Sequence, residues 1–345
     1  MIAGTRPLVL CAAPGIPALG PSGASAHLRG IARALGAPIL CARRSDARGE
    51  HDGEGISVLC PAAEPAWPRA LNRFRELNEL RFSRALVEPA LAYAPTLLWQ
   101  RHTLYSDAGL RIHREGIPWI LEVNAPLAVE RARFESLTLP WLASLYEDEA
   151  LLAAPRVLTV SAWLADWARS RGARDVRHVP NGMTPQVGDR DGTRARLGVD
   201  GRFVIGFLGS MKPWHGIERL PTVLDRFPDA VGLCVGEGPV RITHPRLLNV
   251  GQVPERAVAD HVAAMDIGLA PYRSDAPPWF CPLKILAYRA QGTPVVATDI
   301  GDCALLTGEG GYCGPDLEDG IAAWRGRRAG RSVRGWEDVV REGLG

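Results

Sequence analysis

A loop that leads into a short helix carries residues suited to binding an anion. This corner comprises Phe280, Cys281, Pro282, Leu283 and Lys284. A helix is predicted over Leu283–Gln291, because Pro282 suits its start and Gly292 suits its end. The first N–H groups of a helix point outward at the positive end of its dipole, and Lys284 adds a full charge. The corner suits a phosphate or sugar hydroxyls, although an ordinary strand–helix–strand crossover would also begin at a proline.

A second cationic corner runs from Gly209 to Gly216, directly after an apolar strand, and contains Lys212 and His215. A cation beside backbone N–H groups would hold a diphosphate and stabilise its charge as it leaves. In the alternative interpretation, Lys212 is a solvent-exposed loop residue and Trp214 packs against the domain.

Three more glycine corners follow predicted strands. Gly23 lies in the run from Gly20 to His27, before a helix predicted over Ala26–Leu35. This run lacks the G-x-G-x-x-G spacing of dinucleotide sites, which disfavours an NAD-type domain. The other two corners are Gly236-Glu237-Gly238-Pro239, where backbone could approach a ligand, and Gly251 to Glu255, where a turn around Val253 could pair with a nucleobase edge.

Polar residues also follow two strand ends in the first half of the chain. Arg101 and His102 follow one strand, and Glu122 and Asn124 follow the next. Arg101 suits an acceptor or phosphate better than a core partner. Glu122 is either a general base or a cap for a neighbouring turn, whereas the neutral amide of Asn124 cannot carry a proton at neutral pH. We expect Arg101, His102 and Asn124 on the acceptor side of a site.

Short apolar runs alternate with helical patterns along the chain, which favours parallel sheets buried on both faces. The predicted strands are Pro7–Ala13, Pro38–Cys41, Ile56–Cys60, Thr96–Trp99, Trp119–Val123, Val157–Val160, Val176–Val179, Phe203–Leu208, Ala230–Val235, Leu247–Val250, Ile267–Ala270, Pro294–Ala297 and Gly311–Cys313. Two doubly wound α/β domains follow, with ligands beyond the carboxyl ends of the strands. We predict an N-terminal domain over residues 1–180, a C-terminal domain over residues 181–330, and a helix in residues 331–345 that crosses back to the first domain.

Composition excludes several classes of protein. The 345 residues include 40 basic and 38 acidic ones, a formal charge of +2 that gives no case for a general nucleic-acid surface. No apolar run approaches the roughly 20 residues of a spanning helix, and the N-terminal run is too brief for a signal peptide. We therefore expect a soluble, cytoplasmic protein.

The cysteines and one basic segment complete the sequence pattern. The seven cysteines lack C-x-x-C spacing and are expected to be reduced core thiols, except Cys281, which lies in the proposed site. A basic amphipathic pattern over residues 69–86 forms either a plain surface helix or a weak contact with an anionic membrane.

The corner motifs together resemble the retaining GT-B glycosyltransferases, in particular glycosyltransferase family 4. The resemblance covers nearly the whole chain and is most specific between Val179 and Asp302, through VPNGM, FLGSMKPWHG, VGEGP, VGQVP, DIGLAPY and PLKILAYRAQGTPVVATDIGD. It implies two facing Rossmann-like domains with the active site in the cleft between them. It also implies a sugar-nucleotide donor held mainly by the C-terminal domain, no dinucleotide, and in most members no divalent metal.

The resemblance also implies roles for single residues. Gly23 would lie near the donor phosphates and the acceptor, Val253 near the base, and Lys212 with His215 near the diphosphate. Asn124 stands where the family commonly has a histidine that contacts the sugar or the acceptor.

The sequence departs from the family pattern at two places. The family's two glutamates, which contact the transferred sugar and the ribose, fall on Trp279 and Ala287. Asp275 is a candidate replacement for the first of them. The family's phosphate-binding arginine and lysine fall on Ser210 and His215, which leaves Lys212 as the substitute cation.

We therefore predict a glycosyltransferase that moves a hexose-type sugar from a nucleoside diphosphate sugar to a small-molecule or lipid-linked acceptor, with retention. The catalytic candidates are Lys212, His215, Asn124 and Glu122. The donor-binding candidates are Gly23, Gly209, Lys212, His215, Gly236, Glu237, Gly238, Val253, Asp275, Phe280, Cys281, Pro282, Leu283, Lys284 and Ala287. One alternative is a catalytically silent sugar-nucleotide-binding subunit, which Ala287 favours. Another is a sugar-nucleotide epimerase of the same fold, which would need acid/base groups about the sugar.

Overall fold

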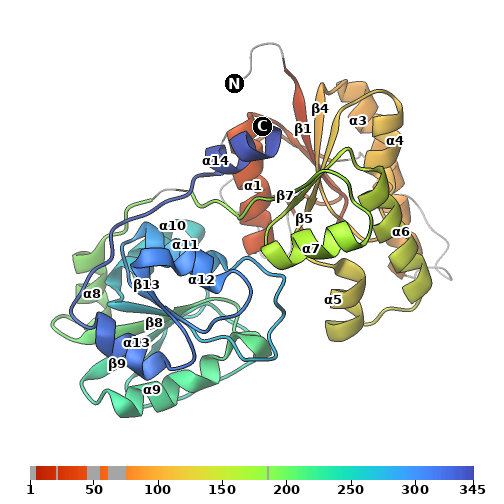
Figure 1. Ribbon diagram of the computed structural model, residues 1–345. Coiled ribbons are helices and arrows are strands. Elements are labelled where there is room, and N and C mark those ends of the chain that lie inside the picture. Colours follow the sequence, from red (N-terminus) through yellow and green to blue (C-terminus); the bar gives the residue numbers. More distant parts are fainter. Residues whose placement is uncertain (1–4, 21, 45–54, 61–74, 185) are drawn as a thin grey trace. The chain divides into compact units, whose positions relative to one another are not determined.

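The chain divides into two compact units in the computed structural model (Figure 1). The structure describes residues 5–20, 22–44, 55–60, 75–184 and 186–345. Unit 1 comprises Met1–Gly182 and Trp336–Gly345, and unit 2 comprises Met183–Gly335.

Unit 1 is built on a parallel seven-stranded sheet in the order β3-β2-β1-β4-β5-β6-β7. Its strands are β1 (Pro7–Cys11), β2 (Ile39–Cys41), β3 (Val58–Leu59), β4 (Leu97–Arg101), β5 (Trp119–Val123), β6 (Arg156–Thr159) and β7 (Val176–His178). Its helices are α1 (Gly23–Leu35), α2 (Arg75–Ala85), α3 (Val87–Tyr93), α4 (Ala108–Arg114), α5 (Leu127–Phe134), α6 (Pro140–Ala153), α7 (Ala162–Ser170) and α14 (Trp336–Leu344). Every residue of β1 and β5 is buried, as continuous apolar runs in a doubly covered sheet require.

Unit 2 is built on a parallel six-stranded sheet in the order β10-β9-β8-β11-β12-β13. Its strands are β8 (Phe203–Leu208), β9 (Ala230–Val235), β10 (Leu247–Asn249), β11 (Ile267–Ala270), β12 (Val295–Ala297) and β13 (Gly311–Cys313). Its helices are α8 (Arg190–Leu197), η2 (Pro213–His215), η3 (Ile217–Arg219), α9 (Leu220–Arg226), α10 (Glu255–Ala264), α11 (Leu283–Ala290), α12 (Cys303–Thr307), η4 (Gly308–Gly310) and α13 (Leu317–Trp324). The predicted α/β class, with two parallel sheets, is confirmed.

The strand order reverses once in each sheet. In unit 1 the chain moves from β1 to β2 on one side and later places β4 on the other side of β1. In unit 2 the same reversal places β9 and β11 on opposite sides of β8. In open α/β sheets, ligands bind beyond the carboxyl ends of the strands at such a switch point. A ligand of unit 2 is therefore expected at the loops after β8 and β11.

Helix α1 begins three residues before its predicted start at Ala26. The hydroxyl oxygen of Ser22 accepts a hydrogen bond from the backbone N–H of Ser25 at 3.1 Å, which caps the helix at Gly23. The predicted boundary was wrong because this N-cap was not recognised. As a result, Gly23 forms the first turn of the helix instead of preceding it.

The C-terminal helix α14 packs against α1 within unit 1 (Figure 1). Gly30 of α1 leaves room for the Trp336 indole, because a Cβ at this glycine would lie 2.3 Å from the ring. The same indole lies 4.9 Å from the His27 ring, measured between centroids. Trp336, Val339 and Val340 are buried in the core that α1 shares with β1 and β2.

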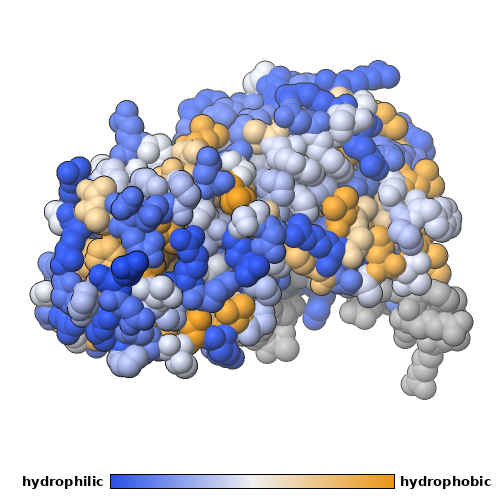
Figure 2. Space-filling model, turned by 60° about the horizontal axis from the view of Figure 1, so that its bottom comes forward, coloured by the Kyte–Doolittle hydropathy of each residue, from blue (hydrophilic) through white to orange (hydrophobic). Residues whose placement is uncertain are grey.

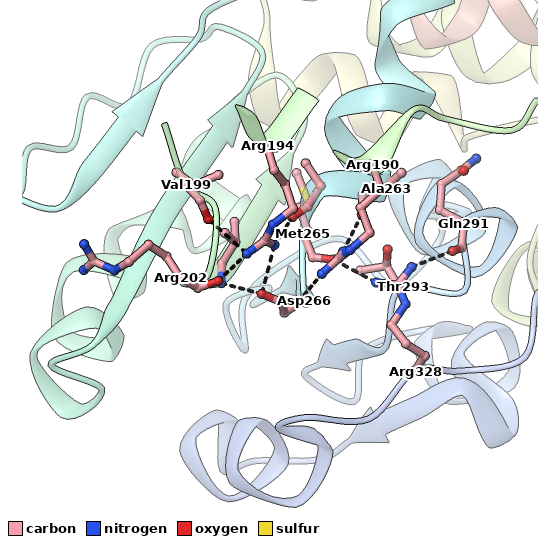
Figure 3. Close-up of polar contacts among 12 residues, drawn as sticks. Arg190, Arg194, Val199, Arg202, Ala263, Met265, Asp266, Gln291, Thr293 and Arg328 are labelled. Carbon is pink, nitrogen blue, oxygen red and sulfur yellow. Dashed lines mark hydrogen bonds and ion pairs between the residues drawn. The ribbon is translucent and has the colours of Figure 1, made fainter. Parts of the chain in front are cut away.

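Three arginines near the amino ends of β8 and β11 bind carbonyl groups inside unit 2 (Figure 3). Arg190 and Arg194 also pair with Asp266, which accepts the backbone N–H of Val204 at 2.8 Å. The carbonyl acceptors of Arg190, Arg194 and Arg328 belong to Val199, Arg202, Ala263, Ala264, Met265 and Gln291. These contacts tie α8 and the segment after α13 to the edge of the sheet opposite its carboxyl ends.

The predicted basic helix over residues 69–86 overlaps α2, and its first residues lie outside the described part of the chain. Glu76 accepts the backbone N–H of Thr138 at 2.8 Å, and Glu79 pairs with Arg131 at 2.7 Å. Arg84 pairs with Asp107 at 3.0 Å. These contacts within unit 1 favour the interpretation of a plain surface helix.

The described helices include none that is long and apolar enough to cross a membrane. Figure 2 shows one face of the molecule, on which hydrophobic residues are scattered among hydrophilic ones. The most exposed large apolar side chains of α5, α6 and α7 are Val129, Phe134, Trp141, Leu145, Leu152 and Trp163.

Candidate functional site

Glycine backbones from two neighbouring strands meet at the carboxyl edge of the unit 2 sheet. A Cβ added at Gly236 would lie 2.2 Å from the carbonyl oxygen of Gly209, and one at Gly238 would lie 1.8 Å from that of Ser210. Gly209 and Gly236 also have positive φ angles of 149° and 116°. Side chains are therefore excluded here, so that bare backbone is available to a ligand.

Lys284 is a buried cation beneath this corner. Its side chain comes from the first turn of α11, and the residue is only 7% exposed. The Nζ atom lies 4.0 Å from the Phe207 ring centroid and 4.8 Å from that of Tyr272, and 3.2 Å from the position of a Cβ at Gly209. It has no hydrogen-bond partner among the described residues.

Burial lowers the pKa of Lys284 to about 7, because the charged form loses its hydration. The two aromatic faces attract a cation, but they do not replace a hydrogen-bonding anion. A buried, unpartnered ammonium group at a switch point is what an anionic ligand would stabilise.

His215 lies beside Lys284 at the same corner. The backbone N–H of Lys212 donates to Nδ1 of His215 at 3.3 Å, so the proton of the neutral ring resides on Nε2. Burial, followed by the charges of Lys284 and Lys212, lowers the pKa of His215 to about 2. His215 is therefore neutral at pH 7 and offers a single ring N–H as a hydrogen-bond donor.

Lys212 is exposed, with Nζ 5.2 Å from the ring centroid of Trp214. Trp214 packs against the core, as the structural interpretation of this corner expects. Lys212 remains in solvent, where the phosphate-binding interpretation needs it. The structure brings Lys212, His215, Gly209 and Lys284 together around one corner. No charged partner of Lys212 is found in the part of the chain that the structure describes.

The corners after β9 and β10 adjoin the first one. The backbone N–H of Gly236 donates to the carbonyl of Gly251 at 2.7 Å, which joins the two turns. Glu237 is exposed between them, and Val253 packs against the core beneath them. The predicted residues Gly236, Glu237, Gly238 and Val253 thus lie in one continuous edge.

The side chains around the helix-start corner differ in how far they are buried. Phe280 packs on Tyr272 with ring centroids 4.6 Å apart, and Cys281 is partly exposed before Pro282, the N-cap of α11. Trp279 and Ala287, at the positions of the family glutamates, are only 5% and 8% exposed. Asp275 pairs with Arg273 at 2.9 Å on an exposed loop, so the candidate replacement for the first glutamate already has a cationic partner.

Glu122 in unit 1 is buried and surrounded by donors. Its carboxylate pairs with His27 Nε2 and accepts the indole N–H of Trp99 at 2.7 Å and an amide N–H of Asn124 at 3.5 Å. Burial alone would raise the pKa of Glu122, but His27, Arg101 and Trp99 together lower it to about 2. The residue therefore remains ionised, with its oxygens engaged inside unit 1.

Arg101 lies beside Glu122 in register, on the strand at the unit 1 switch point. Nη1 of Arg101 is buried without a hydrogen-bond partner among the described residues, whereas His27 and Trp99 contact that carboxylate. His102 differs, since its Nε2 lies 3.4 Å from the buried Glu147 carboxylate. Of the predicted acceptor residues, Arg101 has an available donor, whereas His102 is engaged within unit 1.

Sequence reasoning did not identify His27 and Trp99 as partners of Glu122. The sequence offered one signal for each residue. His27 ends the glycine corner that begins at Gly20, and Trp99 ends a predicted strand. The described residues contain no group of three or more His, Cys, Asp or Glu side chains placed to hold a metal ion, and none of the seven cysteines, all of which are described, forms a disulfide.

Residues 202–324 match the family model described as Glycosyl transferases group 1. TuaC of Bacillus subtilis, named as a teichuronic acid biosynthesis glycosyltransferase, is 28% identical over 298 residues, which cover 74% of this chain and 75% of TuaC. A GDP-mannose-dependent alpha-mannosyltransferase of Mycolicibacterium smegmatis is 30% identical over 154 residues, covering 44% of this chain and 36% of the relative.

The fold is shared with solved structures. HepE from Anabaena, in a complex with UDP and glucose, superposes with a TM-score of 0.69 at 16% identity, over 99% of this chain and 97% of HepE. Sucrose-phosphate synthase from Thermosynechococcus elongatus gives a TM-score of 0.66 at 18% identity, over 98% of this chain and 94% of that chain. Residues 202–324 therefore resemble group 1 glycosyltransferases, and the chain as a whole has a GT-B fold.

Proposed function

We propose that the chain transfers a hexose-type sugar from a nucleoside diphosphate sugar to a small-molecule or lipid-linked acceptor, with retention at the anomeric carbon. The observation that carries this proposal is the ammonium of Lys284, which is buried beneath the Gly209 corner and has no hydrogen-bond partner among the described residues. A bound diphosphate would give this ammonium group the anionic partner that the chain itself does not provide among the described residues.

The names of related proteins support the substrate class. One relative depends on GDP-mannose, and HepE was solved with UDP and glucose and also with UDP-glucose. TuaC is named for teichuronic acid biosynthesis.

The proposed reaction breaks the bond between the anomeric carbon and a diphosphate oxygen. Lys212, the Nε2–H group of His215 and the first N–H groups of α11 bind the departing diphosphate, and the charge of Lys284 stabilises it from beneath. The acceptor hydroxyl oxygen attacks the same face of the oxocarbenium-like centre, and its proton passes to the leaving diphosphate. This route requires no covalent nucleophile.

We assign the acceptor to unit 1, where Arg101 ends β4 and Asn124 directly follows the neighbouring strand β5. Nη1 of Arg101 has no hydrogen-bond partner among the described residues, and Asn124 offers a neutral amide directly after β5. Glu122 then acts as a positioning residue that holds Asn124 by its amide, instead of as a general base. Its depressed pKa makes it a poor proton acceptor at neutral pH.

A two-step experiment tests the proposal. Thermal shift against UDP-, GDP- and dTDP-sugars identifies the donor, and chromatography then follows that donor alone and with candidate acceptors. The proposal is supported if release of the nucleoside diphosphate depends on an acceptor and if an α-linked donor gives an α-linked product. Stabilisation without turnover would indicate a silent binding subunit, and conversion of the donor into an isomer would indicate an epimerase.

A further inference from the structure

We propose that Glu237 binds the ribose hydroxyls of the donor, so that the site selects ribonucleoside over 2′-deoxyribonucleoside diphosphates. This inference rests on the proposed function and assigns the nucleotide class of that donor. It concerns the carboxylate between the corners after β9 and β10.

The order of the strands arranges the three corners along one edge. Strands β8, β9 and β10 are consecutive neighbours in the unit 2 sheet, and all run parallel. Adjacent strands lie about 4.8 Å apart, so the corners after β8 and β10 are separated by roughly 10 Å. A diphosphate at the first corner and a base at the third would leave the ribose at the middle corner, which carries Glu237.

The backbone contacts fix this middle corner between the other two. Gly236 fits against the carbonyl oxygen of Gly209 on one side and donates its N–H to Gly251 at 2.7 Å on the other. A Cβ added at Gly251, which has a φ of 68°, would lie 3.2 Å from Oε1 of Glu237. The carboxylate therefore lies over the turn that begins the third corner.

The Glu237 carboxylate is also available. The residue is exposed, and it makes no hydrogen bond or ion pair with any other residue that the structure describes. This separates it from Asp275, which Arg273 holds, and from Glu122, which His27 and Trp99 hold. Among the candidate site residues, Glu237 is the carboxylate with both oxygens open to a ligand.

A carboxylate suits a ribose because its two oxygens can accept hydrogen bonds from the neighbouring 2′- and 3′-hydroxyls. In Rossmann-type halves, an acidic residue after the second strand performs this role, and β9 is the second strand of unit 2. The methyl group of Ala287 on α11 cannot supply such a bond. Glu237 would therefore recognise the ribose from a different element of the same unit.

Calorimetric titration of the full chain with UDP, GDP and their 2′-deoxy counterparts tests this assignment. The wild-type chain is expected to bind the better ribonucleotide roughly tenfold or more tightly than its 2′-deoxy form, since one charged hydrogen bond is lost. Glu237→Gln keeps the side-chain size and removes the charge. We expect it to weaken the ribonucleotide roughly tenfold and to bring the ratio between the two forms close to 1.

Glu309→Gln is the matched control, because Glu309 is an exposed glutamate between two glycines in η4, before β13. It should change neither affinity nor ratio. Wild-type ribonucleotide affinity in Glu237→Gln, or a preserved preference for ribose, overturns the role of Glu237 alone, provided that Lys284→Met still weakens nucleotide binding. If the wild-type chain binds none of the four nucleotides, the proposed function and this inference both fail.

Discussion

Unit 2 carries cations at both edges of one sheet, and the two groups differ in how their charges are satisfied. At the amino ends of the strands, Arg190 and Arg194 share Asp266 and donate to several carbonyl groups (Figure 3). At the carboxyl ends, Lys284 is as buried as Arg194 but has two aromatic rings and no hydrogen-bond partner among the described residues.

This difference separates a structural role from a binding role. A buried charge without a partner costs stability, whereas a charge with several good hydrogen bonds holds neighbouring elements together. An arrangement that costs stability yet places a cation at a switch point is typical of a site awaiting an anion. The arginine contacts hold unit 2 together, and Lys284 is proposed to act only when the donor is bound.

The largest expected effect comes from Lys284→Met, which keeps an unbranched side chain and removes the ammonium. We expect the rate of sugar transfer at low donor concentration to fall roughly 10²- to 10³-fold, because the departing diphosphate loses a charge in a dry environment. The melting temperature should stay level or rise, because an unsatisfied buried charge is gone. Transfer within threefold of the wild-type rate would remove Lys284 from the mechanism.

Arg194→Met is the counterpart at the opposite edge and should have the reverse effect. It removes the side-chain donor of the Ala264 and Arg202 carbonyls and one of the two arginines that pair with Asp266. We expect unfolding free energy to fall by about 2–3 kcal/mol, seen as a lower melting temperature, with nucleotide affinity unchanged in the folded chain. A weaker affinity for nucleotide at unchanged stability would contradict the division between the two edges.

The pKa of about 7 at Lys284 predicts a pH dependence of donor binding. Diphosphate prefers the protonated lysine, so affinity should decrease roughly tenfold as pH rises from 7 to 9, where the phosphate charge no longer changes. Calorimetry of the wild-type chain across this range measures the change, and the affinity of Lys284→Met should not depend on pH. A parallel decrease in the variant would assign the titration to another group.

The same shift predicts the sign of the ligand-free stability. The folded chain releases the Lys284 proton near pH 7, whereas the unfolded chain keeps it up to the ordinary lysine pKa. Folding therefore becomes more favourable as pH rises between these two values, and the full cost of burying the charge is present below pH 7. Melting curves of the wild-type chain compared with Lys284→Met isolate this contribution.

The sequence predicted the sheets and the corners because these depend on local pattern. Apolar runs bounded by turn residues identified the strands of both sheets in the described part of the chain, and proline and glycine marked the ends of α11. The start of α1 was missed because Ser22 and Ser25 both suit a cap, and only the backbone geometry shows which serine accepts.

The hydrogen-bond and ion-pair partners of each charged side chain could not be predicted, because they come from residues far apart in sequence. Glu122 meets His27 and Trp99 only after three separate elements come together at one sheet edge. The isolation of Lys284 likewise depends on how Phe207 and Tyr272 pack around it. Residue types therefore identified candidate groups, and three-dimensional packing distinguished the available charges from the occupied ones.

The smallest effect is expected from Ala287→Glu, which tests whether α11 also faces the ribose. In the wild-type chain, the new carboxylate would compete with Glu237 for the same hydroxyls and repel it, so affinity should change less than threefold. In the Glu237→Gln background, it should restore affinity by about threefold to tenfold, because a charged acceptor is returned to the site. Since Ala287 is 8% exposed, melting curves must show that the variant folds. A folded double variant without any gain would mean that α11 lies beyond reach of the ribose.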